Sequence, residues 1–217
     1  ANILRSPAVL ALAHHMNDQV ETILFRMFRG SGPEGISGIN EVNILDGIKV
    51  LRPMLKIKKD EIYEYIEKNK LEYIHDHSND DEQFDRNFIR NRLMPLISER
   101  WPAAIKKISH LSELSKQDIE FKNIFMEQRI GEFQSESGLD ILSLSKVSET
   151  ERTYIIRHWI KKSGFPQPNR KTQLEIEKIF FCSQTTSNSS VQWKRADNEQ
   201  KSCKMITDKK SLIIKEP

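Results

Sequence analysis

The sequence has few cysteines and no long apolar run. Its 217 residues contain only Cys182 and Cys203, and no CxxC pair occurs. This cysteine usage argues against structural zinc and favours a reducing compartment. No stretch reaches the 18 or so apolar residues of a membrane helix, and the apolar run near residue 10 is too short for a secretory signal. We therefore expect a cytoplasmic protein without a membrane segment.

Several common nucleotide and metal motifs are also missing. The glycine-rich segment RGSGPEG (residues 29–35) is not followed by the GKS or GKT of a P-loop, and it does not match GxGxxG. No HExxH occurs, and adjacent histidines point in different directions, which argues against a zinc hydrolase. By itself, the glycine-rich segment is typical of a helix end followed by a turn.

Charge is unevenly distributed along the chain. Residues 1–150 carry 20 Lys and Arg against 24 Asp and Glu, whereas residues 151–217 carry 14 against 7. The basic C-terminal part suits a polyanionic partner, although small basic surfaces are common.

The apolar pattern predicts an α/β protein with two domains. Residues 9–13 are typical of a buried parallel strand, and the apolar positions of residues 20–28 follow the period of a helix that Gly30 ends. We expect a long flexible connection at residues 30–47, a strand at 48–51, and helices at 58–70, after Asp85, and from Pro102 towards Gly131. A Ser148–Glu151 capping box predicts another helix that ends at Gly164, and one more is expected at 172–181. Short strands are expected in the last forty residues.

We place the boundary at 130/131, so that 1–130 form part of a parallel-sheet nucleotide-binding domain with a helical extension. Residues 131–217 then form a mainly helical substrate-binding domain with short terminal strands.

Two histidines and two carboxylates lie where the first strand gives way to a helix. His14 and His15 follow the strand, at the edge where open α/β sheets bind ligands. Asp18 and Glu21 have the spacing of an N-cap and its N3 partner. The same spacing places both carboxylates on one side of the helix, where they can hold Mg²⁺. The sequence alone leaves capping and metal binding open.

A third segment combines arginine and asparagine. Arg86, Asn87 and Arg90 share one face of the helix expected after Asp85, and Arg92 lies to its side. Planar guanidinium groups recognise phosphate in bidentate fashion. The alternative is a solvated face paired with Asp80, Asp81 and Asp85.

Four segments taken together carry a resemblance that none carries alone. They are AHHMNDQVET (13–22), RGSGPEGISGI (29–39), LRPML (51–55) and DHSNDDEQFDRNFIRNRLMP (76–95). In this order and spacing they resemble the tRNA(Ile)-lysidine synthetase family of the N-type ATP pyrophosphatase, or PP-loop, superfamily. The resemblance covers the first hundred residues or so.

The resemblance implies a ligase that forms a carbon–nitrogen bond on isoleucine tRNA. ATP adenylates the C2 oxygen of the wobble cytidine, and the ε-amine of free L-lysine then displaces AMP to give lysidine. It implies that Asp18 and Glu21 are an acidic pair that holds Mg²⁺ and attracts the lysine ammonium group, with His14 or His15 as the base.

The resemblance also implies roles for residues outside the acidic pair. Arg29, Gly30, Ser31 and Gly32 would form part of the nucleotide-site wall. The residues expected to contact tRNA are Arg86, Asn87, Arg90, Arg92, Lys194 and Arg195. Whether the chain forms a homodimer is left open.

One departure from the family keeps two other interpretations open. The family's phosphate-binding motif SGGxDS does not occur in these residues, so we expect that they alone do not bind ATP phosphates productively. The alternatives are another PP-loop tRNA-modifying enzyme, such as a thiolation enzyme, or a non-catalytic tRNA-binding fragment. Thiolation enzymes often carry CxxC pairs, and their absence here argues against that alternative.

Overall fold

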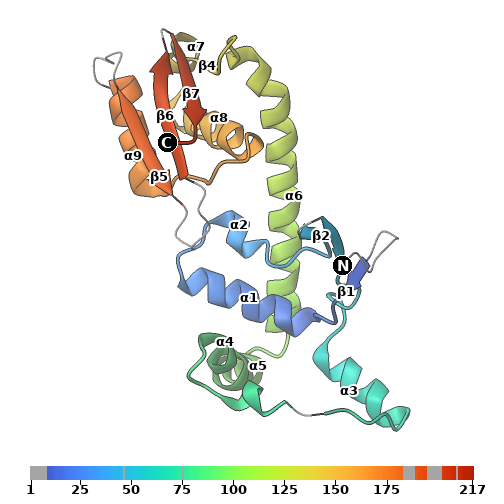
Figure 1. The fold of residues 1–217 in the computed structure, drawn as a ribbon. Coiled ribbons are helices and arrows are strands. Elements are labelled where there is room, and N and C mark those ends of the chain that lie inside the picture. Colours follow the sequence, from blue (N-terminus) through green and yellow to red (C-terminus); the bar gives the residue numbers. More distant parts are fainter. Residues whose placement is uncertain (1–8, 46, 75, 183–188, 195–201, 209) are drawn as a thin grey trace. The chain divides into compact units, whose positions relative to one another are not determined.

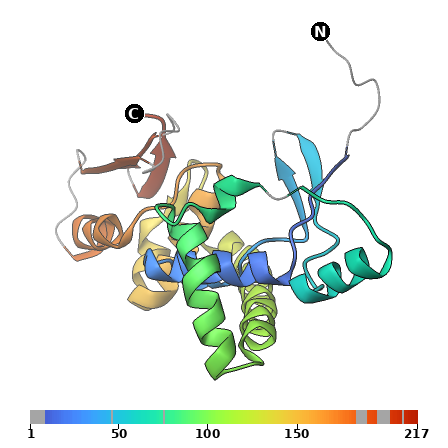
Figure 2. The same cartoon turned by 90° about the horizontal axis from the view of Figure 1, so that it is seen from below.

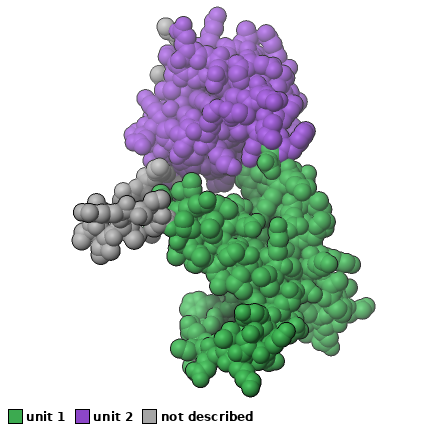
Figure 3. Space-filling view, turned by 90° about the vertical axis from the view of Figure 1, so that its right-hand side faces the viewer, with its two compact units in different colours: residues 1–120 green, residues 121–217 purple. Residues whose placement is uncertain are grey.

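A computed structural model describes residues 9–45, 47–74, 76–182, 189–194, 202–208 and 210–217. The chain divides into two compact units, residues 1–120 and 121–217, coloured separately in Figure 3. The division falls within the long helix α6 (Ala104–Ile130), and our sequence-based boundary at 130/131 lies at the end of the same helix. Among the described residues, no helix is both long and apolar enough to cross a membrane.

Unit 1 contains a three-stranded mixed sheet (Figures 1 and 2). Strand β3 (Ile48–Leu51) lies between β1 (Val9–Ala11), which is parallel to it, and β2 (Val42–Leu45), which is antiparallel. The predicted strands are confirmed at residues 9–11 and 48–51, and the two are parallel, while residues 12 and 13 lie beyond the end of β1. The expected burial of the first strand is wrong for the described residues, since Val9 is 53% exposed. Among the described strands, β1 pairs with β3 alone and forms one edge of the sheet.

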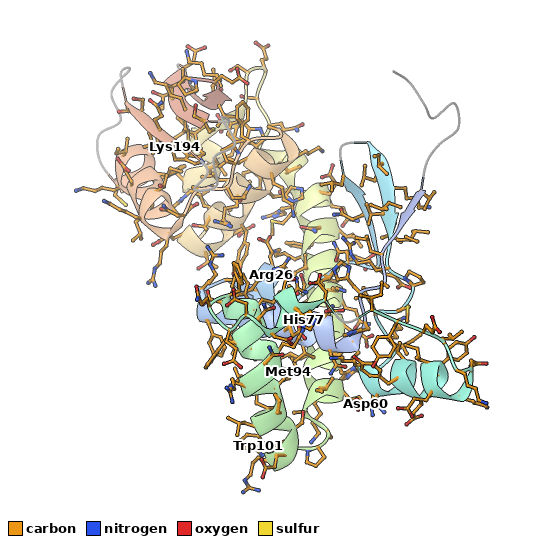
Figure 4. All side chains as sticks on the ribbon, turned by 60° about the horizontal axis from the view of Figure 1, so that its bottom comes forward. Arg26, Asp60, His77, Met94, Trp101 and Lys194 are labelled. Atoms are coloured by element: carbon orange, nitrogen blue, oxygen red, sulfur yellow. The ribbon has the colours of Figure 1, made fainter. Side chains whose placement is uncertain are left out.

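Helices complete unit 1 around a small apolar core. They are α1 (Met16–Phe28), α2 (Pro33–Ile36), α3 (Lys59–Lys68), a 3₁₀ turn (His77–Asp80), α4 (Asp85–Phe88), a π-helical turn (Ile89–Leu93), α5 (Met94–Arg100) and the first part of α6. Val20 and Leu24 of α1 pack against Ile89 and Met94, the latter labelled in Figure 4. The expectation that Asp85 caps its helix is wrong: Phe84 occupies the N-cap position without a side-chain hydrogen bond, and Asp85 is the first helical residue.

Unit 2 packs helices against a four-stranded antiparallel sheet. Its elements are the end of α6, a 3₁₀ turn (Gly131–Phe133), β4 (Leu139–Asp140), α7 (Ile141–Ser145), α8 (Glu149–Lys162), α9 (Arg170–Glu177), a π-helical turn (Lys178–Cys182), β5 (Ser190–Lys194), β6 (Ser202–Asp208) and β7 (Ser211–Lys215). The strands lie in the order β4-β7-β6-β5. Ser148 caps α8 as predicted, because its Oγ accepts a hydrogen bond from the Glu151 backbone N–H. The predicted α/β class and short C-terminal strands are confirmed.

A buried ion pair joins α8 to α9 in this core. Arg152 and Glu177 are 8% and 7% exposed, and Arg152 Nε donates to Glu177 Oε2 over 3.0 Å. Arg152 Nη1 also donates to the Leu144 carbonyl, and its guanidinium lies 4.3 Å from the centre of the Phe181 ring. These partners compensate the desolvation of the two charges.

The glycine-rich connection at residues 30–47 is structured, contrary to the expected flexible link. Its described part contains α2 and β2, and Gln19 of α1 fastens the segment before β2. Gln19 Oε1 accepts from the Ile39 N–H over 2.6 Å, while Gln19 Nε2 donates to the Ile39 carbonyl and to Ser112 Oγ of α6. Lys116 Nζ donates to the same carbonyl. Short strands between glycines give little periodicity, which is why the sequence did not indicate β2.

We predict that alanine costs more stability at Gly38 than at Gly30. Both have positive φ, +66° and +76°, so either substitution strains the backbone by about 1–2 kcal/mol. A Cβ at Gly38 would also lie 2.7 Å from Gln19 Cδ, whereas Gly30 has open space, which adds ~1–3 kcal/mol for overpacking. Urea unfolding of both variants measures the difference. Equal losses would show that Gln19 does not hold this segment.

Candidate functional site

Helix α1 begins one turn earlier than the sequence pattern indicated, at a histidine cap. His15 is the N-cap: its Nδ1 accepts from the Asp18 N–H over 3.3 Å, and Asp18 Oδ2 accepts from the His15 N–H over 2.9 Å. Asp18 is therefore the N3 residue of a capping box, and the predicted Asp18 N-cap with Glu21 at N3 is wrong. An imidazole nitrogen supplies the acceptor that an Asp or Ser oxygen usually provides.

Arg90 joins the two carboxylates of α1 to the π-helical turn. Its Nε and Nη2 donate to Glu21 Oε1 and Oε2 over 2.9 and 2.8 Å, a bidentate pair, and Nη2 also reaches Asp18 Oδ1 over 3.1 Å. Glu21 is 2% exposed and Asp18 7%. The hydrogen bond to Glu21 raises the pKa of Arg90, so this guanidinium is permanently charged. Bidentate, charge-assisted bonds of this kind are among the strongest in proteins.

Arg86 of α4 lies beside the same carboxylates in a looser arrangement. Its Nη2 is 3.8 Å from Asp18 Oδ1, and its Nε is 3.6 Å from Glu21 Oε2. The buried Nε makes no hydrogen bond, and the side chain is 43% exposed. Arg86 therefore balances the second negative charge, and an anion can approach the exposed part of its side chain but not the buried Nε. The alternative pairing of Arg86 and Arg90 with Asp80, Asp81 and Asp85 is not what the structure shows.

This arrangement does not fit the predicted Mg²⁺ site at Asp18 and Glu21. Each of their four oxygens accepts a hydrogen bond from Arg90 or from the His15 backbone. Two guanidinium groups already neutralise the pair, and a divalent cation would be repelled by both. Among the described residues, no group of three or more His, Cys, Asp or Glu side chains is placed to hold a metal ion.

His14 and His15 lie near the acidic pair with their δ nitrogens engaged. His14 Nδ1 accepts from Arg52 Nε over 3.3 Å, as His15 Nδ1 does from the Asp18 backbone. Burial lowers the pKa of both rings below the ordinary 6.5, more than the attraction of Asp18 raises it. The hydrogen bonds that both Nδ1 atoms accept favour the Nε2–H tautomer of each neutral ring, in which Nε2–H is a donor. His15 Nδ1 also lies 3.2 Å from Asp18 Oδ2 and forms an ion pair with it when the ring is protonated.

The other predicted site residues are divided between several places. Arg29–Gly32 end α1 and lead into α2, roughly 16 Å along the helix axis from Asp18. The Asn87 amide donates to the Ser78 and Asp81 carbonyls, and exposed Arg92 pairs with Glu82. Lys194 lies at the end of β5 in unit 2 (Figure 4). Arg195 lies outside the described residues.

Sequence reasoning missed Arg52 and Gln19. Arg52 follows β3, and β3 is parallel to β1, which precedes His14. Carboxyl ends of parallel strands meet at one sheet edge, so the polar residues after each strand were the available signal. Gln19 carried no such signal, because its partner Ile39 contributes only backbone atoms.

We predict that both histidine rings titrate below pH 6.5 as Nε2–H tautomers. A lowered pKa favours the neutral ring in the folded state. The associated stability is complete above pH 6.5 and is lost as the pH falls through the folded-state pKa. NMR titration of the ring nitrogens, assigned with His14→Asn and His15→Asn, measures both properties. A pKa above 6.5 or an Nδ1–H tautomer contradicts the assignment.

We also predict that Arg90→Met lowers the free energy of unfolding by about 3–5 kcal/mol, because it leaves the Glu21 carboxylate buried without its main partner. Arg92→Met is the matched control, since the Arg92–Glu82 pair is exposed and contributes less than about 1 kcal/mol. Chemical denaturation of the two variants checks this. Similar losses would mean that Arg90 does not organise unit 1.

Comparisons with known proteins agree in pointing to one family. Residues 1–97 match the family model described as PP-loop domain. Over 191 residues the chain is 33% identical to tRNA(Ile)-lysidine synthase of Buchnera aphidicola (subsp. Schizaphis graminum), covering 88% of this chain and 43% of that protein. The same-named proteins of Wigglesworthia glossinidia brevipalpis and Escherichia coli O157:H7 are 34% and 33% identical, over 87% and 81% of this chain and 47% and 41% of theirs.

The chain thus spans less than half the length of these curated relatives. The similarity nevertheless extends over most of the chain, and the arginine–carboxylate cluster lies within the residues that the family model matches. Residues 1–97 match the PP-loop domain family model, and most of the chain is similar in sequence to part of the tRNA(Ile)-lysidine synthases.

Proposed function

We propose that the protein carrying this chain is an ATP-dependent ligase that joins free L-lysine to C2 of the wobble cytidine of isoleucine tRNA. An adenylated tRNA is the intermediate, and lysidine is the product. The observation that carries this proposal is the similarity to tRNA(Ile)-lysidine synthases along most of the chain. A reducing, cytoplasmic setting is part of the proposal and is supported by two free cysteines.

Asp18, Glu21, Arg86 and Arg90, here called the Arg90 cluster, support specific roles for individual residues. ATP transfers its adenylyl group to the C2 oxygen with release of pyrophosphate, and the lysine ε-amine then forms the C2–N bond as AMP leaves with that oxygen. The exposed part of the Arg86 guanidinium side chain is suited to phosphate oxygens of the nucleotide or of the tRNA. Asp18 and Glu21 act through the arginines: by fixing Arg90 and attracting Arg86, they place the Arg86 guanidinium where it can donate to phosphate oxygens. Asp18 and Glu21 are therefore positioning residues. Neither of them holds Mg²⁺ in the proposed reaction.

The histidines take a donor role in the same account. With Nε2–H as the donor, His14 and His15 can hydrogen-bond to an oxygen that gains negative charge, a form of stabilisation that needs no proton transfer. The general-base role expected from the resemblance would require each ring to change tautomer and lose its Nδ1 hydrogen bond.

Unit 2 is proposed to contact the tRNA through its basic surface. Residues 151–217 carry twice as many basic as acidic residues, and Lys194 is exposed at the end of β5. Contacts of this kind position the RNA without reading its sequence.

The function is tested by incorporation of labelled lysine into an isoleucine tRNA transcript by the full-length protein. Incorporation should require ATP and should disappear when the wobble cytidine is replaced by uridine. ATP-independent incorporation, or incorporation into the uridine transcript, contradicts the proposed reaction. A thiolated product would assign the protein to the alternative activity.

We predict that Asp18→Asn and Glu21→Gln each reduce kcat/KM for lysidine formation by at least ~10²-fold. Because these residues position arginines, the KM for ATP or tRNA should rise, and added Mg²⁺ should not restore activity. Exposed Asp60 at the start of α3 provides the matched control, Asp60→Asn. Wild-type activity in both variants refutes the site, and rescue by Mg²⁺ or Mn²⁺ assigns the pair to metal binding instead.

A further inference from the structure

A cavity of about 340 Å³ opens in unit 1 between the end of α1 and the α4 segment. Three of its lining residues connect it to the apolar core of this unit: Ile89 is buried in that core, and the partly buried Phe25 and Leu93 pack against it. The remaining lining residues are two exposed aromatic rings and two charged side chains: Phe28, Phe88, Arg29 and Asp85. Phe28 is 62% and Phe88 51% exposed. Three rings at one opening form an aromatic surface that a ligand can cover.

The two charged side chains are free to meet a ligand. The Arg29 guanidinium lies 5.1 Å from the centre of the Phe25 ring. Within the described part of the chain, neither the Arg29 nor the Asp85 side chain makes a hydrogen bond or an ion pair with another residue. The cavity therefore combines aromatic faces with one cationic donor group and one anionic acceptor.

The cavity lies one to two turns along α1 from Glu21 of the Arg90 cluster, and none of the four cluster residues lines it. Phe25 and Phe28 follow Glu21 at i+4 and i+7, and hence share its face of α1. On the opposite side, Asp85 and Phe88 flank Arg86 on α4. A polymeric substrate whose reacting monomer lies at the Arg90 cluster would place a neighbouring monomer in this cavity.

We propose that the cavity binds one unstacked RNA base that carries an exocyclic amine, next to the nucleotide held at the Arg90 cluster. The inference rests on the proposed function, which makes RNA the substrate. Proteins recognise unpaired bases by stacking them on aromatic side chains. The Asp85 carboxylate accepts a hydrogen bond from an amine such as cytosine N4, and Arg29 neutralises a neighbouring phosphate.

The test measures binding of short, labelled cytidine and uridine homo-oligonucleotides of equal length by fluorescence anisotropy, with the full-length protein. The wild type should bind the cytidine strand more tightly, because uracil presents a carbonyl where cytosine has its amine. Phe88→Ala and Phe28→Ala should each weaken binding of both strands by about 5-fold or more. Phe121→Ala is the control, because Phe121 is 73% exposed and lies outside the cavity.

Asp85→Asn separates base recognition from stacking. The variant should keep most of its affinity for the uridine strand and lose the preference for cytidine. Equal wild-type affinity for the two strands, or equal effects of Phe88→Ala and Phe121→Ala, overturns the proposal. A third result would also overturn the proposal: ATP displaces the cytidine strand, and Phe88→Ala weakens ATP binding as much as it weakens binding of that strand. The cavity would then be a mononucleotide site. The assay contains neither lysine nor, in its binding arms, ATP. The strand preference is therefore measured independently of lysidine formation. A protein that forms no lysidine can still show the cytidine preference, and a protein that forms lysidine can lack it.

Discussion

The bidentate pair between Arg90 and Glu21 is the interaction on which unit 1 depends. It joins the second turn of α1 to a π-helical turn 69 residues later in the chain, and Glu21 is almost fully buried. A buried carboxylate without a cation would be strongly unfavourable, so this pair fixes where the α4 segment lies on α1. π-helical turns occur frequently at functional sites, and here the turn carries the arginine.

The chemistry of the site follows from that pairing. Two carboxylates and two guanidinium groups neutralise one another, so the cluster is not the acidic patch that the sequence indicated. The groups it presents to a ligand are instead the exposed part of the Arg86 side chain and the Nε2 atoms of the two imidazole rings. Such a surface favours phosphates and other oxygen-rich groups, and it needs no metal ion between the carboxylates.

Local patterns allowed most of the elements to be predicted. The apolar positions of α1 and the Ser148 cap of α8 depend on neighbours within a few residues, and so do the short strands at the C-terminus. The site could be predicted only as a set of residues. Its geometry depends on contacts between distant segments, such as Glu21 with Arg90 or His14 with Arg52, and residue spacing does not encode them. The identity of the N-cap also escaped prediction, because His15 takes a position where Asp or Ser is commoner.

A double-mutant cycle between Glu21 and Arg90 tests this account most directly. The free energy of unfolding is measured for Glu21→Gln, Arg90→Met, the double variant and the wild type. If the pair organises unit 1, the double variant loses much less stability than the sum of the single variants, with a coupling of about 2–3 kcal/mol. Additive losses, within about 0.5 kcal/mol, would contradict the account, because the two residues would then contribute independently.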